Sequence, residues 1–168
     1  MKVIFPGSFD PVTLGHLSVI HRASHLFDEV VVAVLENQQK DHLFTGTERI
    51  EMLEELLYDK DNVSVELFSG LLADYYGLKQ ADAVVRGLRS PSDYEYERQL
   101  AALNHSLNPK LETIFLPTEV KFSFVSSSYA REVASYGGDV YGLVPEQVAR
   151  RLYAKFRERA DAGVQLEK

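Results

Sequence analysis

The chain has 168 residues, 45% of them hydrophobic and 26% charged, which suits one compact domain over residues 1–168 and excludes low-complexity and disordered classes. It contains no cysteine, which excludes disulfides, thiolate catalysis and Cys-ligated metal sites and favours a cytoplasmic location. The formal net charge is -7 and no apolar run approaches the ~20 residues of a membrane span, so neither a nucleic acid nor a membrane is expected as a partner.

Five short apolar runs alternate with segments of helical period along the chain. This pattern is typical of a parallel sheet whose strands are covered on both faces. The expected strands are residues 3–5, 30–35, 63–68, 83–86 and 113–116. The sequence therefore predicts an α/β fold, a Rossmann-like doubly wound sheet of five parallel strands with helices on both faces.

Six helices are expected between and after these strands. Thr45 and Glu48 form a capping box, Ser90 and Pro91 supply an N-cap with an N1 proline, and Pro145 opens the last helix. The expected helical segments are residues 16–27, 45–57, 71–78, 90–107 and 126–134, and a final helix from 145 onward. The polar end, residues 157–168, is expected to fray.

The loop after the first predicted strand, residues 6–16, is long for a connection of this kind. In an open parallel sheet, ligands bind beyond the carboxyl ends of the strands, where helix N-termini point inward. The loop places Gly15 and His16 at such an N-terminus, whose backbone amides suit phosphate oxygens. His16 can donate a hydrogen bond to charge that develops during phosphoryl or nucleotidyl transfer. The alternative is an ordinary turn that ends in a helix-starting histidine, because a lone Gly-His is a weak motif.

Two arginines, Arg86 and Arg89, stand three residues apart on either side of Gly87 at the end of the fourth predicted strand. Arginine suits phosphate because its planar guanidinium binds two oxygens at once and stays charged. The alternative is that both are solvated surface arginines. Asp93 and Glu95 follow closely, and we interpret them as carboxylates that complement the N-terminus of the next helix.

Three serines, Ser126, Ser127 and Ser128, follow the fifth predicted strand and lead into a helix. Their hydroxyls and the exposed amides predict a second anion site, although an ordinary N-cap explains one of the three. Lys40 ends a polar loop and by itself is typical of a surface lysine. The histidines form no ligand pair with a nearby acid, so no metal bound by protein side chains is expected.

Together, residues 13–16 and 125–131 resemble the T/H-x-G-H and I-S-S-T-x-x-R signatures of the nucleotidylyltransferase superfamily. Residues 6–11, 44–45 with 48–49, 85–89, 93–97 and 103–104 further resemble the bacterial phosphopantetheine adenylyltransferases, and the similarity runs from residue 3 to residue 152. This resemblance implies transfer of the adenylyl group of ATP to 4'-phosphopantetheine, with dephospho-coenzyme A and pyrophosphate as products. The acceptor phosphate attacks the α-phosphorus in line without a covalent enzyme intermediate, and Mg²⁺ accompanies ATP.

The resemblance also implies a role for each matching residue. His16 is the implied catalytic residue, which stabilises the transition state. The implied 4'-phosphopantetheine contacts are Ser8, Lys40, Leu72, Arg86 and Asn104. The implied ATP contacts are Ser8, Phe9, His16, Gly87, Leu88, Arg89, Glu97, Phe122, Ser123, Phe124, Val125, Ser126, Ser127 and Ser128. The cations expected to gather phosphates despite the acidic total are Lys40, Arg86, Arg89, Arg131 and His16 in its protonated form.

Three positions differ from the family pattern. Ser8 stands where many members have threonine, Phe122 replaces a frequent tryptophan, and Lys40 lacks the neighbouring lysine and proline. The resemblance further implies a homo-oligomer, expected to be a hexamer, and coenzyme A as a further small-molecule ligand.

Two other functions remain open on the sequence. One is a nucleotidylyltransferase with another acceptor, such as nicotinamide mononucleotide or a sugar or glycerol phosphate, because the superfamily signatures describe the nucleotide end only. The other is a non-catalytic nucleotide sensor on the same fold, which would have no use for His16 as a charge stabiliser. A fragment of a class I tRNA synthetase is disfavoured, since the chain lacks a lysine-rich second signature.

Overall fold

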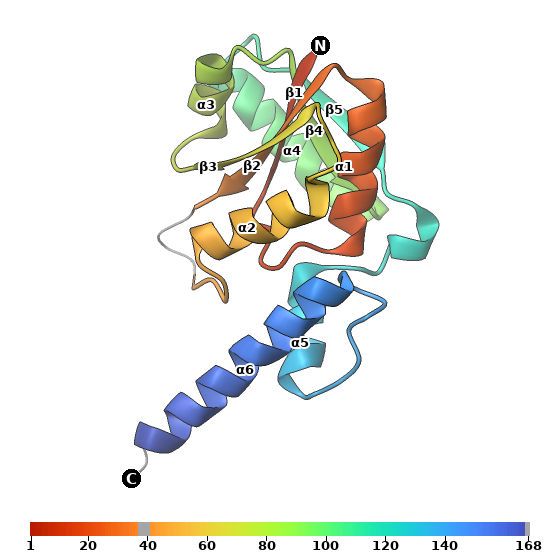
Figure 1. Ribbon diagram of the computed structural model, residues 1–168. Helices are drawn as coiled ribbons and strands as arrows, with labels where there is room; N and C mark the ends of the chain where they lie inside the picture. The colour runs from red at the N-terminus through yellow and green to blue at the C-terminus, as the bar shows by residue number, and fades with distance from the viewer. Residues whose placement is uncertain (37–40, 167–168) are drawn as a thin grey trace.

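A five-stranded sheet forms the centre of the computed structural model, which describes residues 1–36 and 41–166. All neighbouring strands are parallel, in the order β3-β2-β1-β4-β5. The strands are β1 (Lys2–Gly7), β2 (Glu29–Leu35), β3 (Val63–Phe68), β4 (Ala83–Leu88) and β5 (Thr113–Pro117). The predicted α/β fold with a doubly wound parallel sheet is confirmed (Figure 1).

Alternate residues of each strand pack against opposite helical layers, because successive side chains of a strand point to opposite faces of the sheet. Val3 and Phe5 belong to one core cluster with residues of α1 (Leu14–Leu26) and α2 (Gly46–Leu57). Ile4, between them, belongs to a second cluster with residues of α3 (Leu72–Lys79). The helix α4 (Pro91–Leu107) packs against α3 and β4. The sheet is thus covered on both faces.

Side-chain caps begin the helices near the carboxyl edge of the sheet. Thr13, Thr45 and Ser90 cap α1, α2 and α4, and each side chain accepts a hydrogen bond from a backbone N–H three residues on. The capping box of Thr45 and Glu48 is confirmed. The cap at Thr13 begins α1 at Leu14, two residues before the predicted start.

Two strands extend further toward the site than predicted. β1 continues to Gly7, opposite Val34 of β2, and β4 continues to Leu88, opposite Pro117 of β5. The prediction ended these strands at Phe5 and Arg86 because Pro6 and Gly87 interrupt the apolar pattern, whereas the backbone pairing continues past them. Gly87 and Leu88 therefore lie within a strand rather than in a loop.

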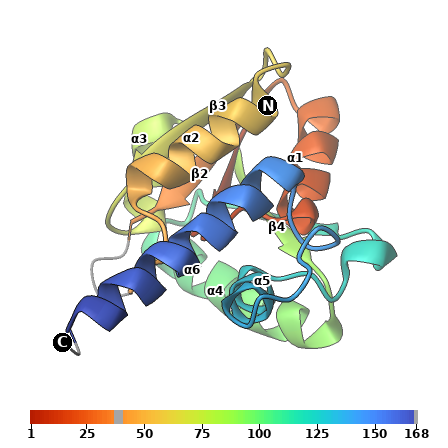
Figure 2. The same ribbon diagram turned by 60° about the horizontal axis from the view of Figure 1, so that its bottom comes forward.

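Two further helices lie beyond the carboxyl ends of the strands (Figure 1). They are α5 (Ser127–Ser135), which follows the short 3-10 helix η1 (Val120–Phe122), and α6 (Glu146–Leu166). Figure 2, which brings this end forward, shows α6 running alongside α2, with α5 on its other side. Ion pairs of Lys155 with Glu48 and of Arg151 with Glu55 join α6 to α2.

The helix α6 continues to Leu166, whereas fraying was expected from residue 157. Arg, Glu and Ala, which recur between residues 157 and 162, have high helix propensity and favour this extension. Within the described ranges, the helices are too short or too polar to traverse a lipid bilayer.

Candidate active site

The site begins where β1 and β4 separate. These strands pair only at Val3 and Ile4, while β1 continues to pair with β2 and β4 with β5 up to their carboxyl ends. The strand order reverses at this point, so the loops after β1 and β4 lead to opposite faces and leave a crevice between them. Arg86 spans part of it, since its Nη1 donates to the carbonyl oxygen of Pro6 at 2.7 Å.

Two adjoining cavities, each of about 320 Å³, occupy this crevice. The first lies among the loop after β1, the start of α1, the end of β4 and the start of α5. Its lining includes Ser8, Thr13, Gly15, His16, Arg86, Gly87, Arg89, Asp93, Glu97, Thr118, Val125, Ser126 and Ser127. Polar and charged side chains predominate, together with the glycines Gly7, Gly15 and Gly87, which suits phosphate groups.

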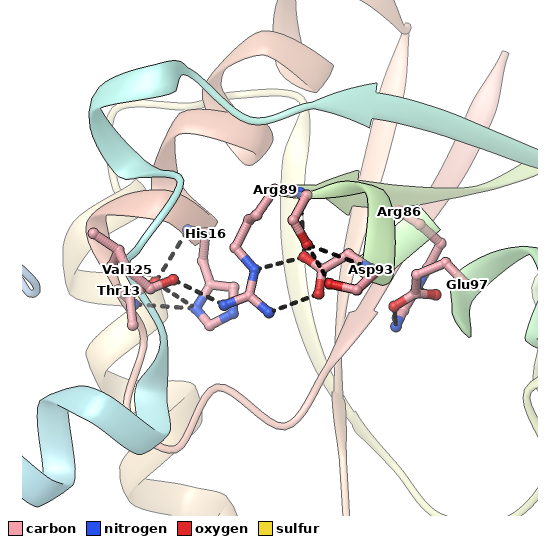
Figure 3. Close-up of polar contacts among 9 residues, drawn as sticks. Thr13, His16, Arg86, Arg89, Asp93, Glu97 and Val125 are labelled. Carbon is pink, nitrogen blue, oxygen red and sulfur yellow. Dashed lines mark hydrogen bonds and ion pairs between the residues drawn. The ribbon is translucent and has the colours of Figure 1, made fainter. Parts of the chain in front are cut away.

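His16 lies at the third position of α1 and lines the first cavity. Its Nδ1 accepts a hydrogen bond from the backbone N–H of Thr13 at 3.1 Å, and its ring meets the Phe9 ring edge-on with centroids 5.0 Å apart. Because Nδ1 accepts, the neutral imidazole carries its proton on Nε2. The contact with Thr13, drawn in Figure 3, leaves the Nε2 proton of His16 available for donation.

The environment of His16 disfavours its charged form. Burial lowers its pKa from the ordinary value of 6.5 to about 4, and the positive charges of Arg89 and Arg86 contribute in the same direction. The neutral form of His16 is therefore favoured at pH 7, and the condition under which it would add a positive charge to the site is not met. A neutral imidazole can stabilise an oxyanion as an N–H donor.

Arg89 is held by two partners at the edge of the first cavity (Figure 3). Its Nε donates to Oδ2 of Asp93 at 2.8 Å, and its Nη1 donates to the carbonyl oxygen of Val125 at 3.1 Å. The second bond ties the loop before α5 to the end of β4. Asp93 was interpreted only as a helix-terminus carboxylate, and the signal for this additional role is its position four residues after Arg89.

The second cavity is mainly apolar. It lies between the sheet and α3 and α4, and the residues that line only this cavity are Leu35, Phe68, Leu72, Val84, Leu100, Ala101, Asn104 and Thr113. Such a lining suits an uncharged, extended ligand, with the Asn104 amide and the Thr113 hydroxyl as hydrogen-bonding groups.

Six residues line both cavities, namely Pro6, Gly7, Ser8, Arg86, Tyr96 and Glu97. The two cavities therefore meet at Ser8 and Arg86. A molecule in the second cavity can place a terminal phosphate beside a phosphate in the first.

The helix N-termini offer fewer free amides than the sequence suggested. At α1, the N–H of Leu14 donates to the carbonyl oxygen of Leu143 and that of His16 donates to Thr13 Oγ1. Among the described residues this leaves Gly15 as the amide that can face an anion. At α5, the Tyr129 amide donates to Ser126 Oγ, and the amides of Ser127 and Ser128 remain.

The other predicted ATP residues are placed unequally. Gly87, Val125, Ser126 and Ser127 line the first cavity, together with Ser8, His16, Arg89 and Glu97. The predicted residues outside both linings, within the part of the chain that the structure describes, are Phe9, Leu88, Phe122, Ser123, Phe124 and Ser128. Phe9 is fully buried behind the loop, and Phe124 is 60% exposed. Lys40 lies outside the described residues.

The buried residues Asp10 and Arg49 support the loop after β1, and the sequence did not predict these roles. Asp10 accepts backbone hydrogen bonds from Leu43 and Phe44, both at 2.9 Å. Arg131 donates to the Asp10 carbonyl oxygen, so it supports this loop instead of lining the first cavity. Arg49 binds the Ser8 carbonyl oxygen at 2.8 Å. Charged residues are usually exposed, so sequence alone gives little signal for such roles.

No group of three or more His, Asp or Glu side chains that could hold a metal ion occurs in residues 1–36 and 41–166. A divalent cation at this site would therefore take most of its ligands from a bound nucleotide and water, as Mg²⁺ does when it accompanies phosphates.

Comparison with known proteins identifies the family. The model of the cytidylyltransferase-like family matches residues 4–133. The chain is 49% identical to a phosphopantetheine adenylyltransferase of Dictyoglomus thermophilum, over 93% of this chain and 95% of that protein. It is 50% identical to a phosphopantetheine adenylyltransferase of Caldanaerobacter subterraneus subsp. tengcongensis, over 92% of this chain and 97% of that protein.

Solved structures agree on the fold. A putative nicotinate-nucleotide adenylyltransferase from Vibrio parahaemolyticus has a TM-score of 0.64 at 21% identity, over 94% of this chain and 97% of that chain. A nicotinic acid mononucleotide adenylyltransferase from Plasmodium falciparum, complexed with NaAD, has a TM-score of 0.62 at 17% identity, over 95% and 96% of the two chains. On the strength of the sequence relatives, the chain belongs to the phosphopantetheine adenylyltransferase family within the cytidylyltransferase-like proteins.

Proposed function

We propose that this chain transfers the adenylyl group of ATP to 4'-phosphopantetheine and releases dephospho-coenzyme A and pyrophosphate. The observation that carries the proposal is the junction of a polar and an apolar cavity at Ser8 and Arg86, beside His16. The names of the relatives, at 49% and 50% identity, support the same substrates.

The apolar cavity would hold the pantetheine arm of the acceptor. Leu72 would pack against the arm, and Asn104 would hydrogen-bond one of its amides. Arg86 would bind the acceptor phosphate at the junction, since two of its five N–H groups remain after its bonds to Pro6 and Glu97. Lys40 would be a second acceptor contact.

The polar cavity would hold ATP. The end of β4, through Gly87, Leu88 and Arg89, and the start of α5 would contact the nucleotide, with Glu97 as a further contact. The remaining proposed nucleotide contacts are Ser8, Phe9, Phe122, Ser123, Phe124, Val125, Ser126, Ser127 and Ser128. Of these, Phe122, Ser123, Phe124 and Ser128 lie outside the cavity lining and would reach ATP only after the segment that leads into α5 moves toward it. Phe9 would act through its contact with His16.

Catalysis would consist of positioning and charge stabilisation, as is general for phosphoryl-group chemistry. The acceptor phosphate oxygen bonds to the α-phosphorus as the bond to pyrophosphate breaks. His16 would donate its Nε2 proton in a hydrogen bond to an α-phosphate oxygen whose charge increases in the transition state. Mg²⁺, carried by ATP, would neutralise charge on the leaving pyrophosphate.

The proposal also covers the location, the oligomeric state and a further ligand of the protein. The protein would be a cytoplasmic homo-oligomer, a hexamer, with coenzyme A as a further ligand. The helix α4 supports self-association, because none of its residues is buried and Leu103 and Leu107 are each more than half exposed. Light scattering tests this expectation, since a mass near 19.0 kDa would contradict it.

The test of function is pyrophosphate release from ATP with each candidate acceptor. Release that depends on 4'-phosphopantetheine, with formation of dephospho-coenzyme A, supports the proposal. Equal turnover with nicotinamide or nicotinic acid mononucleotide would favour a different acceptor. Tight ATP binding without turnover on any acceptor would favour a nucleotide sensor.

A further inference from the structure

Arg49 is a buried cation outside both cavity linings of the described chain. It lies on α2 and is 1% exposed. Its Nη1 donates to the carbonyl oxygens of Ser8, at 2.8 Å, and Leu35, at 3.0 Å. Its Nε donates to the carbonyl oxygen of Thr45 at 3.3 Å. One guanidinium thus joins the carboxyl ends of β1 and β2 to the start of α2.

Burying a charge is costly, and an apolar side chain of similar size often fills such a place with equal or greater stability. Burial lowers the pKa of Arg49, while the carboxylates of Asp10 and Glu36 act in the opposite direction. Stability alone therefore does not explain why an arginine occupies this position. The groups that the guanidinium binds indicate its role.

The Ser8 carbonyl belongs to the peptide that precedes Phe9, a residue with a left-handed backbone, φ 48°. This conformation is strained for a bulky aromatic residue, at a cost of about 1–2 kcal/mol. It places the Phe9 ring beneath Gly7, where an added Cβ would lie 2.9 Å from the ring. The strain persists only if surrounding contacts hold it, and Arg49 supplies one at the peptide itself.

The Phe9 ring in turn contacts the imidazole of His16, edge-on at 5.0 Å between centroids and with an interplanar angle of 70°. The residue that precedes Phe9 is Ser8, which lines both cavities. The Ser8–Phe9 peptide therefore connects a buried guanidinium to Ser8 and His16, which both line the first cavity.

We propose that Arg49 is a positioning residue, which holds the Ser8–Phe9 peptide so that the Phe9 ring fixes the His16 imidazole and Ser8 stays at the junction of the two cavities. This inference rests on the proposed function for its kinetic consequence. Its structural consequence, the orientation of His16, does not depend on any substrate.

The test compares Arg49→Met with Met52→Ala. Met52 is fully buried on the same helix and donates no hydrogen bond to the loop, so its variant is a control for lost stability alone. For each variant the measurements are kcat and KM for ATP and 4'-phosphopantetheine, and the pKa and tautomer of His16 from ¹⁵N NMR of the protein without substrates.

In Arg49→Met we expect kcat to fall about 10- to 100-fold, the size of effect that a small misplacement produces, with each KM changed less than about threefold. The pKa of His16 should rise from about 4 toward 6.5 as the ring gains freedom and solvent. Met52→Ala should melt at a lower temperature and keep the kcat and the His16 signals of the original protein.

Arg49→Lys keeps the positive charge with a single ammonium that cannot span the same carbonyl oxygens, and it serves if Arg49→Met does not fold. We expect a smaller loss of kcat and a smaller change in the His16 signals. Phe9→Leu should shift the His16 signals while Arg49 stays in place.

Unchanged kcat and His16 signals in folded Arg49 variants would overturn the inference and leave Arg49 a structural residue. A raised KM at constant kcat would also overturn it. If the original protein shows no turnover with 4'-phosphopantetheine, the proposed function fails, and the His16 NMR comparison still decides the positioning role.

Discussion

The Arg86 guanidinium donates two parallel hydrogen bonds to the Glu97 carboxylate, from Nε to Oε2 at 2.6 Å and from Nη2 to Oε1 at 2.5 Å (Figure 3). Both side chains are at most one-quarter exposed, and both line the two cavities. Such a bidentate pair fixes the plane of the guanidinium. Glu97 therefore determines which N–H groups of Arg86 face a bound phosphate.

Glu97→Gln should weaken this arrangement, because the amide is neutral and offers one acceptor oxygen instead of two. We expect the free energy of unfolding to fall by about 1–3 kcal/mol, and the KM for the acceptor to rise. Urea denaturation and initial-rate kinetics measure the two effects.

Glu95→Gln is the matched control, since Glu95 forms a well-exposed pair with Arg98 on the same helix. It should change the free energy of unfolding by less than about 0.5 kcal/mol. Equal effects of the two substitutions would contradict a special role for the Arg86–Glu97 pair.

Asp10→Asn should destabilise the protein by about 1–3 kcal/mol, because the buried carboxylate accepts the backbone N–H groups of Leu43 and Phe44 through separate oxygens. An asparagine has only one acceptor oxygen and turns an amide donor toward the other N–H. Chemical denaturation measures the loss. Asp161→Asn, at an exposed position on α6, should leave the midpoint unchanged, and an equal midpoint for Asp10→Asn would refute the role assigned to Asp10.

The lowered pKa of His16 makes stability depend on pH. The folded protein binds this proton only near pH 4, whereas the unfolded chain binds it near 6.5. The contribution is therefore fully present above pH 6.5 and is lost as the pH falls from 6.5 toward 4. Between pH 7 and pH 5, His16 should account for a loss of about 1–2 kcal/mol in the free energy of unfolding.

His16→Asn, which cannot take up this proton, should lose correspondingly less stability between the same two pH values. Urea denaturation of both proteins at pH 7 and pH 5 measures the difference. An NMR titration of His16 with a midpoint near 6.5 would contradict the burial effect directly.

His16→Ala should lower kcat and kcat/KM together by about 10²–10³-fold, if its Nε2 proton stabilises charge mainly in the transition state. ATP affinity, measured by calorimetry, should weaken far less. A large loss of ATP affinity with kcat nearly intact would show that His16 contributes ground-state binding only. A thermal melt that confirms folding precedes either interpretation.

The sequence predicted the strands and helices well because apolar alternation, β-branched runs and the caps at Thr45 and Ser90 are local signals. It ended β4 two residues early, at Arg86, since Gly87 interrupts the apolar run and the continued pairing depends on distant Leu116 and Pro117. It also started α1 at His16, whereas the N-cap at Thr13 begins the helix at Leu14.

For the site, the motifs indicated His16, Arg86 and Arg89, which the fold brings to one cavity. Their internal partners were not predictable, because the contact of Phe9 with His16 depends on a positive φ, and that of Arg49 with Ser8 joins residues 41 positions apart. The sequence does not distinguish a charged residue that is buried from one that is exposed.

We propose above that the two cavities hold ATP and 4'-phosphopantetheine with their phosphates in contact. The most direct measurement is pyrophosphate release from ATP, with and without 4'-phosphopantetheine, coupled to mass-spectrometric detection of dephospho-coenzyme A. We predict release only when 4'-phosphopantetheine is present, with one dephospho-coenzyme A formed for each pyrophosphate. Release that is independent of this acceptor, or equally fast with nicotinic acid mononucleotide, would show that the second cavity does not select 4'-phosphopantetheine.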